Sequence, residues 1–163
     1  MTETTTPTNQ APAPQTGLII QRVFIKDTSF EAPNTPEIFL DEWKPQVDIE
    51  IQNRARALGN DLHEVVLRVA VTAKINAKTA FLIEVQQAGV FSIHGLPEDQ
   101  ISAIVGGYCP TILFPYAREA VASMIMRGGF PPIHLAPVNF EAAYQQHLQQ
   151  LANKAAETGE VQH

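Results

Sequence analysis

The stretch EVVLRVAVTAKI, residues 64–75, decides the fold of this 163-residue chain. One parity of the stretch is apolar, namely Val65, Leu67, Val69, Val71, Ala73 and Ile75. The other parity carries polar or charged side chains, namely Glu64, Arg68, Thr72 and Lys74. Because successive side chains of a strand point to opposite faces, this alternation predicts a long β-strand with one buried face and one wet face.

Three further segments on either side of this stretch also have strand character. Residues 18–30 are rich in Ile, Val and Phe, and the apolar residues Val47, Ile49 and Ile51 alternate with polar ones. After a short turn at residues 76–78, residues 79–93 return as a fourth strand. Long strands joined by short turns predict a four-stranded antiparallel sheet.

The period of the apolar residues changes after this β region. From Leu113 to Ile125 the spacing is helical, and Gly128-Gly129 followed by Pro131-Pro132 ends that helix. A second helix is expected to begin near Asn139, a suitable N-cap, whereas Gly106-Gly107 is expected to form a turn. Strands followed by helices indicate an α+β fold with two main C-terminal helices packed on one sheet face.

The predicted domain organisation is a single folded unit, residues 17–153, between two polar tails. Residues 1–16 and residues 154–163 have no apolar periodicity, so both are expected to be disordered. Two helices cannot cover strands of this length. The uncovered apolar area therefore predicts a homo-oligomer.

The composition argues against several classes of protein. The formal net charge is −6, and Lys and Arg form no cluster along the sequence, which is unlike a nucleic-acid binder. Residues 1–16 do not resemble a signal peptide, and no apolar run is long enough for a membrane helix, so we expect a cytoplasmic protein that does not insert into the membrane. Nucleotide-binding loops and the ligand spacings of metal sites are missing, so we expect neither cofactor nor metal.

Cys109 is the only candidate nucleophile in the sequence. It lies just before a predicted helix, where a thiol pKa can be lowered, but a lone Cys is more often a small buried apolar residue. An enzyme that uses Cys109 or a buried carboxylate remains the alternative from another class. Trp43 and the Phe residues fit core packing or a groove for apolar segments, and the sequence alone leaves both open.

A series of short motifs, in order along residues 18–151, resembles the SecB family of bacterial export chaperones. The motifs are FEAPN (30–34), EVVLRV (64–69), EVQQAGVF (84–91), YCP (108–110), LFPYARE (113–119), RGGFPP (127–132) and LAPVNF (135–140). The chain departs from the family at Ala143, where a larger apolar residue is usual, and in its long N-terminal tail.

The resemblance implies a non-enzymatic, ATP-independent holdase that binds unfolded precursor proteins and delivers them to the SecA translocation ATPase. It also implies a homotetramer, built as a dimer of dimers, with the helices between two outer sheets. The implied SecA-binding positions are Asp27, Glu31, Leu82 and Glu84. The implied client groove includes Phe39, Trp43 and Val47. The alternative within this family is an adaptor that binds SecA without capturing clients.

Strand geometry is compatible with the implied partner site. Asp27 and Glu31 are four residues apart on a strand, so their side chains leave the same face. Phe81 and Ile83 have the parity expected to face the helices, which leaves Leu82 on the wet face. An ordinary solvated sheet face remains the other interpretation, because single exposed Leu residues are common.

Overall fold

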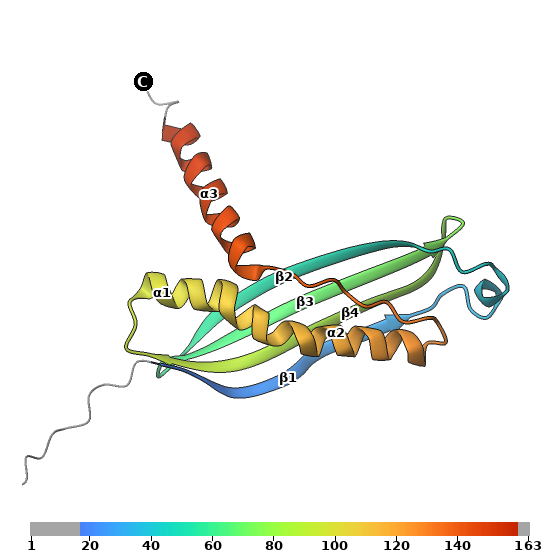
Figure 1. Ribbon diagram of the computed structural model, residues 1–163, viewed down its shortest axis with the longest axis horizontal. Helices are drawn as coiled ribbons and strands as arrows, with labels where there is room; N and C mark the ends of the chain where they lie inside the picture. Colours follow the sequence, from blue (N-terminus) through green and yellow to red (C-terminus); the bar gives the residue numbers. More distant parts are fainter. Residues whose placement is uncertain (1–16, 160–163) are drawn as a thin grey trace, which may run out of the picture.

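The computed structural model describes residues 17–159 and has the predicted architecture, a four-stranded antiparallel sheet followed by helices. The strands are β1 (Gly17–Glu31), β2 (Gln46–Gly59), β3 (Leu62–Ile75) and β4 (Lys78–His94), in the spatial order β1-β4-β3-β2. A short 3-10 helix, η1 (Glu37–Leu40), lies in the connection from β1 to β2 at one end of the sheet (Figure 1). The α+β prediction is confirmed, and β1 and β2 are the two edge strands.

Tight turns with left-handed backbone join the three hairpin strands. Asn60 and Asp61 connect β2 to β3, and Asn76 and Ala77 connect β3 to β4; all have φ between 50° and 64°. Two consecutive residues with positive φ form the type of turn whose twist matches that of paired strands. The turn predicted at residues 76–78 is therefore present, with Lys78 already in β4.

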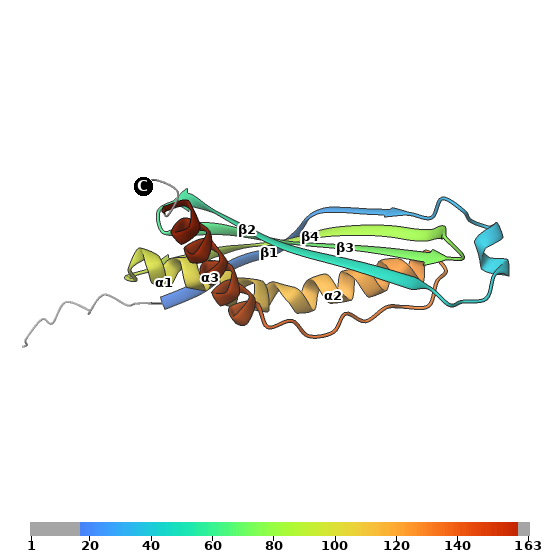
Figure 2. The same cartoon turned by 90° about the horizontal axis from the view of Figure 1, so that it is seen from above.

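The core lies between one face of the sheet and helix α2 (Cys109–Arg127), as the edge-on view in Figure 2 shows. The inward parity of β3 and β4 is almost completely buried, as predicted from residues 64–75. Fully buried side chains include Leu67, Val69, Phe81, Val85, Leu113, Val121 and Ile125. Alternate residues of the sequence therefore lie on opposite faces of the sheet, one buried and one outer.

The helical region begins earlier than its apolar spacing indicated. Helix α1 (Glu98–Ala103), a π-helical turn η2 (Ile104–Tyr108) and α2 follow one another without a break (Figure 1). The expected turn at Gly106-Gly107 is wrong, because both glycines lie within η2. A Cβ on Gly106 would come within 2.4 Å of the Tyr144 ring, so the glycine is there to let the last helix approach.

Helix α3 (Phe140–Gly159) contacts the rest of the molecule through its first turns and then projects away from the sheet (Figures 1 and 2). Asn139 is its N-cap, as predicted, since the Asn139 Oδ1 accepts a hydrogen bond from the Ala142 N–H at 3.0 Å. Phe140 is buried and meets the Phe114 ring edge-on at 5.6 Å. Leu148 and Leu151 remain exposed.

Helix α3 extends into the segment that the sequence assigned to the C-terminal tail. It continues to Gly159, so residues 154–159 are helical. Lys154, Ala155, Ala156 and Glu157 are all strong helix formers, which explains why the helix continues without apolar contacts. The tail predicted over residues 1–16, and residues 160–163 of the other tail, lie outside the described residues. None of the helices within residues 17–159 is both long enough and apolar enough to cross a membrane.

Candidate functional site

An aromatic cluster lies at the η1 end of the sheet and contains two of the predicted groove residues. The Trp43 ring stacks on Phe81 with centroids 6.4 Å apart and lies 5.6 Å from Phe130. Phe39 lies 5.0 Å from the same Phe130 ring, yet 49% of Phe39 is exposed. The cluster therefore has a buried base, formed by Phe81 and Phe130, and an accessible rim that includes Phe39. The rings of the rim pack on the core and are also partly open to solvent.

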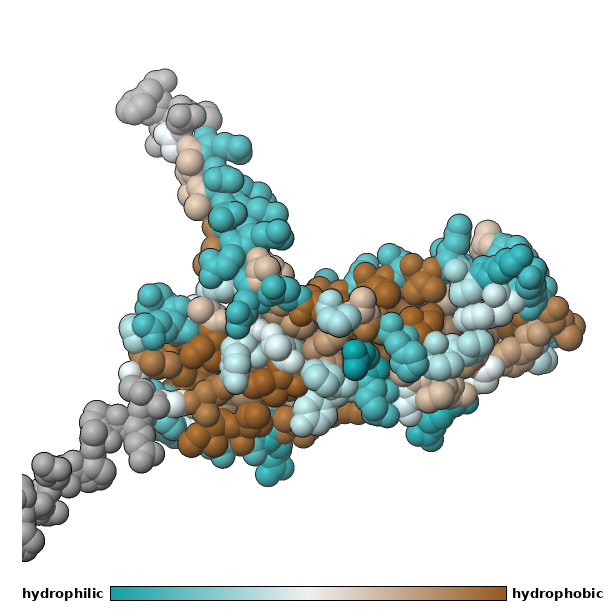
Figure 3. All heavy atoms as spheres, in the orientation of Figure 1, coloured by the Kyte–Doolittle hydropathy of each residue, from teal (hydrophilic) through white to brown (hydrophobic). Residues whose placement is uncertain are grey.

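Apolar side chains continue from this cluster along the helix-facing side of edge strand β2. Val47 and Ile49 are exposed, and Ile51 is half-buried. Figure 3, which views the helix-bearing side, shows apolar surface here and beside α2. We call Phe39, Trp43, Val47, Ile49 and Ile51 the apolar strip.

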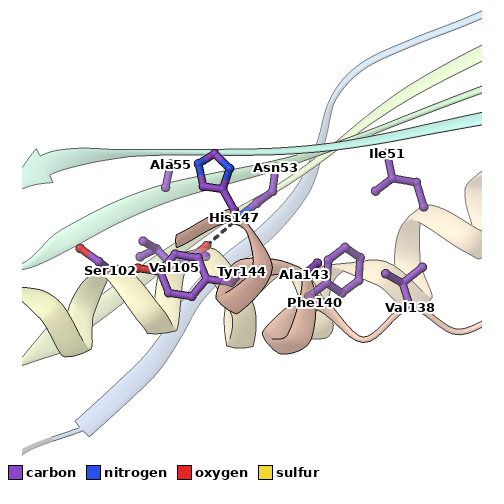
Figure 4. Close-up of a pocket in the computed structure, with 11 residues that line it drawn as sticks. Ile51, Asn53, Ala55, Ser102, Val105, Val138, Phe140, Ala143, Tyr144 and His147 are labelled. Atoms are coloured by element: carbon purple, nitrogen blue, oxygen red, sulfur yellow. Dashed lines mark hydrogen bonds between the residues drawn. The ribbon is translucent and has the colours of Figure 1, made fainter. Parts of the chain in front are cut away.

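The apolar strip ends at a pocket of about 600 Å³ between β2 and the start of α3. Ile51, Asn53 and Ala55 form one wall, and η2 and α3 supply the other walls (Figure 4). The Asn53 Nδ2 donates a hydrogen bond to the Val105 carbonyl oxygen at 3.0 Å, drawn as the dashed line in Figure 4. The Asn53 Oδ1 is buried and has no hydrogen-bond partner among residues 17–159. A bound N–H donor at this position would relieve the cost of that unpaired acceptor.

Strand β2 also has an open backbone edge beside the apolar strip. It pairs with β3 on one side, and no other strand among the described residues pairs with its second side. An exposed edge presents unpaired backbone N–H and C=O groups to any extended chain that approaches. The sequence did not reveal this, because edge position depends on strand order.

The opposite, outer face of the sheet brings together three of the four residues implied as a SecA site. Glu31 lies directly opposite Leu82 in the β1–β4 pairing, and Ser29 lies opposite Glu84. Glu31, Leu82 and Glu84 line a hollow of about 310 Å³. Asp27 pairs with Gln86 on the adjoining row and does not line the hollow. The predicted facing of Leu82 is confirmed, since Phe81 and Ile83 are buried and Leu82 is 38% exposed.

The hollow contains three charged residues that the sequence argument missed. Asp48 and Glu50 of β2 line it from the other edge, and Arg68 of β3 lies between them and Glu84. The Arg68 Nη2 donates to the Glu84 Oε2 at 2.6 Å, and Nη1 lies 3.5 Å from the Glu50 Oε2. The Arg68 guanidinium holds the pKa of Glu84 below its usual range. We call Glu31, Asp48, Glu50, Leu82 and Glu84, together with Arg68, the acidic hollow.

Cys109, the first residue of α2, is fully buried in the core. Burial raises the pKa of the Cys109 thiol to about 12, because the thiolate would lose its hydration. Within residues 17–159, no three His, Cys, Asp or Glu side chains are grouped so that they could hold a metal ion.

Comparison with known proteins gives a family match over most of the chain. A family model described as preprotein translocase subunit SecB matches residues 10–151. Among solved structures, a SecB-like chaperone from Mycobacterium tuberculosis, in complex with a ChAD peptide from the HigA1 antitoxin, superposes with a TM-score of 0.63. It is 18% identical, and the match covers 74% of this chain and 90% of that one. A protein of unknown function from Streptococcus agalactiae gives a TM-score of 0.33 at 11% identity, over 76% of this chain and 99% of its own.

Proposed function

Because this chain belongs to the SecB family, whose members are chaperones and not enzymes, we propose that it is an ATP-independent holdase that binds unfolded precursor proteins. We also propose that it works in the cytoplasm as a homotetramer, a dimer of dimers, and hands its clients to SecA. The observation that supports client binding best is the apolar strip, which runs beside an open strand edge into a pocket of about 600 Å³.

The apolar strip and the open edge suit an unfolded polypeptide for complementary reasons. Each Leu or Phe side chain of a client buried there would contribute about 1.5–3 kcal/mol. The free backbone groups of β2 could pair with an extended client whatever its sequence. A folded protein hides both its apolar side chains and its backbone groups, so selectivity for non-native chains follows. The peptide bound to the SecB-like chaperone from M. tuberculosis is in keeping with this proposal.

Assembly would use other apolar surface of the isolated chain. Ile19, Ile20 and Ile25 of edge strand β1 are exposed, as are Tyr116 and Met126 of α2. Four chains of 17.9 kDa would form a particle of about 72 kDa. Light scattering that found only the monomer mass would contradict this part of the proposal.

Aggregation of a chemically denatured client, followed without nucleotide, tests client binding. We expect the purified chain to suppress aggregation, and the double variant Val47→Asp with Ile49→Asp to lose most of that activity. Gln52→Asp is the matched control, because it adds a carboxylate to the same strand on the outer face. Equal loss in both variants, or no suppression by the wild type, would refute client binding on this surface. If the chain binds SecA but captures no client, the result supports the adaptor alternative.

The acidic hollow, with Asp27 on its adjoining row, is the proposed SecA site. Its carboxylates beside Leu82 suit a basic segment with one apolar anchor, and electrostatics would set the encounter rate. Glu84→Lys should weaken SecA binding, measured by calorimetry, while client capture stays near normal. If both activities fall together, the site is misplaced or the variant is unfolded, which circular dichroism would distinguish.

A further inference from the structure

Both edge strands change the sign of their charge partway along the outer face of the sheet. On β2, the outward positions run from Asp48 and Glu50 to Arg54 and Arg56. On β1 the order is reversed, and the cationic residues Arg22 and Lys26 precede Asp27 and Glu31. Because successive neighbours in the order β1-β4-β3-β2 are antiparallel, β1 and β2 run in opposite directions. The like-charged halves of the two strands therefore lie at the same end of the sheet.

The register shows where the change occurs. The row formed by Gln52, Arg68, Gln86 and Asp27 lies between the carboxylates of the acidic hollow and a second group of charges. The next row contains Arg54, and the row after it contains Arg56, Glu64, Val90 and Arg22. We call Arg22, Lys26, Arg54 and Arg56 the basic zone.

A single nearly buried carboxylate lies within the basic zone and neutralises it only in part. The Lys26 Nζ donates to the Glu64 Oε1 at 2.8 Å, and the Arg56 Nε donates to the Glu64 Oε2 at 2.5 Å. These two cations lower the pKa of Glu64, whose side chain is only 8% exposed, so Glu64 is ionised at neutral pH. Arg22 and Arg54 are exposed and form no ion pair with any residue between 17 and 159. The zone therefore keeps an excess of positive charge facing solvent.

We propose that the outer face is a bipolar docking surface for one extended partner segment. Basic and apolar residues of this segment enter the acidic hollow, and an acidic stretch of the same segment binds the basic zone. The proposal rests on the proposed function of the hollow and adds a second half to it. The row of Glu84 and the row of Arg54 are separated by four strand residues, about 13 Å. An extended partner would thus present its carboxylates about four residues from its Lys or Arg.

Charge complementarity favours such a segment over other occupants. A nucleic acid is negative throughout, so the part that reached the adjoining acidic hollow would be repelled. A wholly basic segment would meet the same penalty over Arg54 and Arg22. Only a partner whose charge changes sign along its length gains on both sides of the boundary row.

The test uses two fluorescent peptides and the full-length chain. The bipolar peptide is Lys-Leu-Lys-Ser-Thr-Ser-Glu-Thr-Glu, and the half peptide has Gln in place of both Glu residues. We expect the wild type to bind the bipolar peptide about two- to fivefold more tightly for each ion pair formed, with the advantage shrinking as salt is added. In Arg54→Glu the preference should disappear or reverse, while affinity for the half peptide stays within about twofold.

Two further variants separate this inference from the function on which it rests. Glu84→Lys should weaken both peptides, and Arg118→Glu, an exposed charge reversal on α2 at the other side of the sheet, should change neither. If Glu84→Lys weakens binding but Arg54→Glu keeps the preference for the bipolar peptide over the half peptide, the basic zone is not part of the site. Only the proposed role of the acidic hollow is then supported. If neither variant matters, the proposed function of the hollow fails as well. If Arg54→Glu changes the particle mass in the absence of peptide, this face is instead an interface between copies of the chain, and the assigned partner is overturned.

Discussion

Replacing Gly106 by Ala should loosen helix α3 without destabilising the whole domain. A Cβ at this position would lie 2.4 Å from the Tyr144 Cδ2, closer than real Cβ atoms come to a neighbour, and 3.1 Å from its Cγ, which is tighter than most such contacts. The ring cannot avoid the new methyl group by a small rotation, because the contact includes the atom at the root of the ring. The first turns of α3 would therefore have to move away from η2.

Two opposing effects set the magnitude. Ala in place of Gly within a helix stabilises the folded state by about 0.5–1 kcal/mol. The lost contact of the Tyr144 ring costs about 1–2 kcal/mol, since the ring is only half-buried. The free energy of global unfolding should therefore change by less than about 1.5 kcal/mol. The local opening of α3 should become more favourable by about 1–2 kcal/mol, which is about 5- to 30-fold in population.

Hydrogen exchange measured by mass spectrometry distinguishes the local effect from the global one. Amides at residues 143–148 should exchange about 5- to 30-fold faster in Gly106→Ala, whereas amides of β3 and β4 should be unchanged. Gly159→Ala is the control, because a Cβ there meets nothing within 4 Å. Unchanged exchange at residues 143–148, or an equal effect in a background that already carries Tyr144→Ala, would show that this contact does not hold α3.

Three other predictions follow from single interactions. The folded-state pKa of Glu64 lies below its ordinary value of 4.5. The contribution of Glu64 to stability is therefore present above about pH 4.5 and is lost as the pH falls through the lower folded value. In urea unfolding, Glu64→Gln should lack the loss of stability that this titration causes in the wild type. The Cys109 thiol, with a pKa of about 12, should resist iodoacetamide at pH 8 until the chain is denatured, and Cys109→Ser should keep holdase activity. Asn139→Ala removes the N-cap of α3 and should destabilise that helix by about 1 kcal/mol, seen as faster exchange of its first amides.

The strand half of the fold was predictable because alternation is a local property. The parity of residues 64–75 assigned each of its side chains to a face, and β3 and β4 bury that parity as expected. The fourth strand and its turn at residues 76–77 were read in the same way. Helix boundaries were less predictable, since η2 is held in place by β2 and α3, which are distant from it in the sequence.

The candidate site was predictable only where a motif pointed to it. Glu31, Leu82 and Glu84 came from the family resemblance, and strand parity placed Leu82 on the outer face. Arg68 was visible on the same parity of its strand, but nothing in the sequence paired it with Glu84. Their contact depends on the β3–β4 register, which joins residues 16 positions apart.

The sequence alone determined the number of long strands, the face that each side chain takes, the N-cap of α3 and the end of α2. These features depend on the backbone period and on residues a few positions apart. Only the tertiary structure decided that β2 is an open edge, that Gly106 receives the ring of Tyr144, and that charges from β1 and β2 meet in two zones of opposite sign. These depend on strand order and register, which bring distant segments together through contacts that no local pattern specifies.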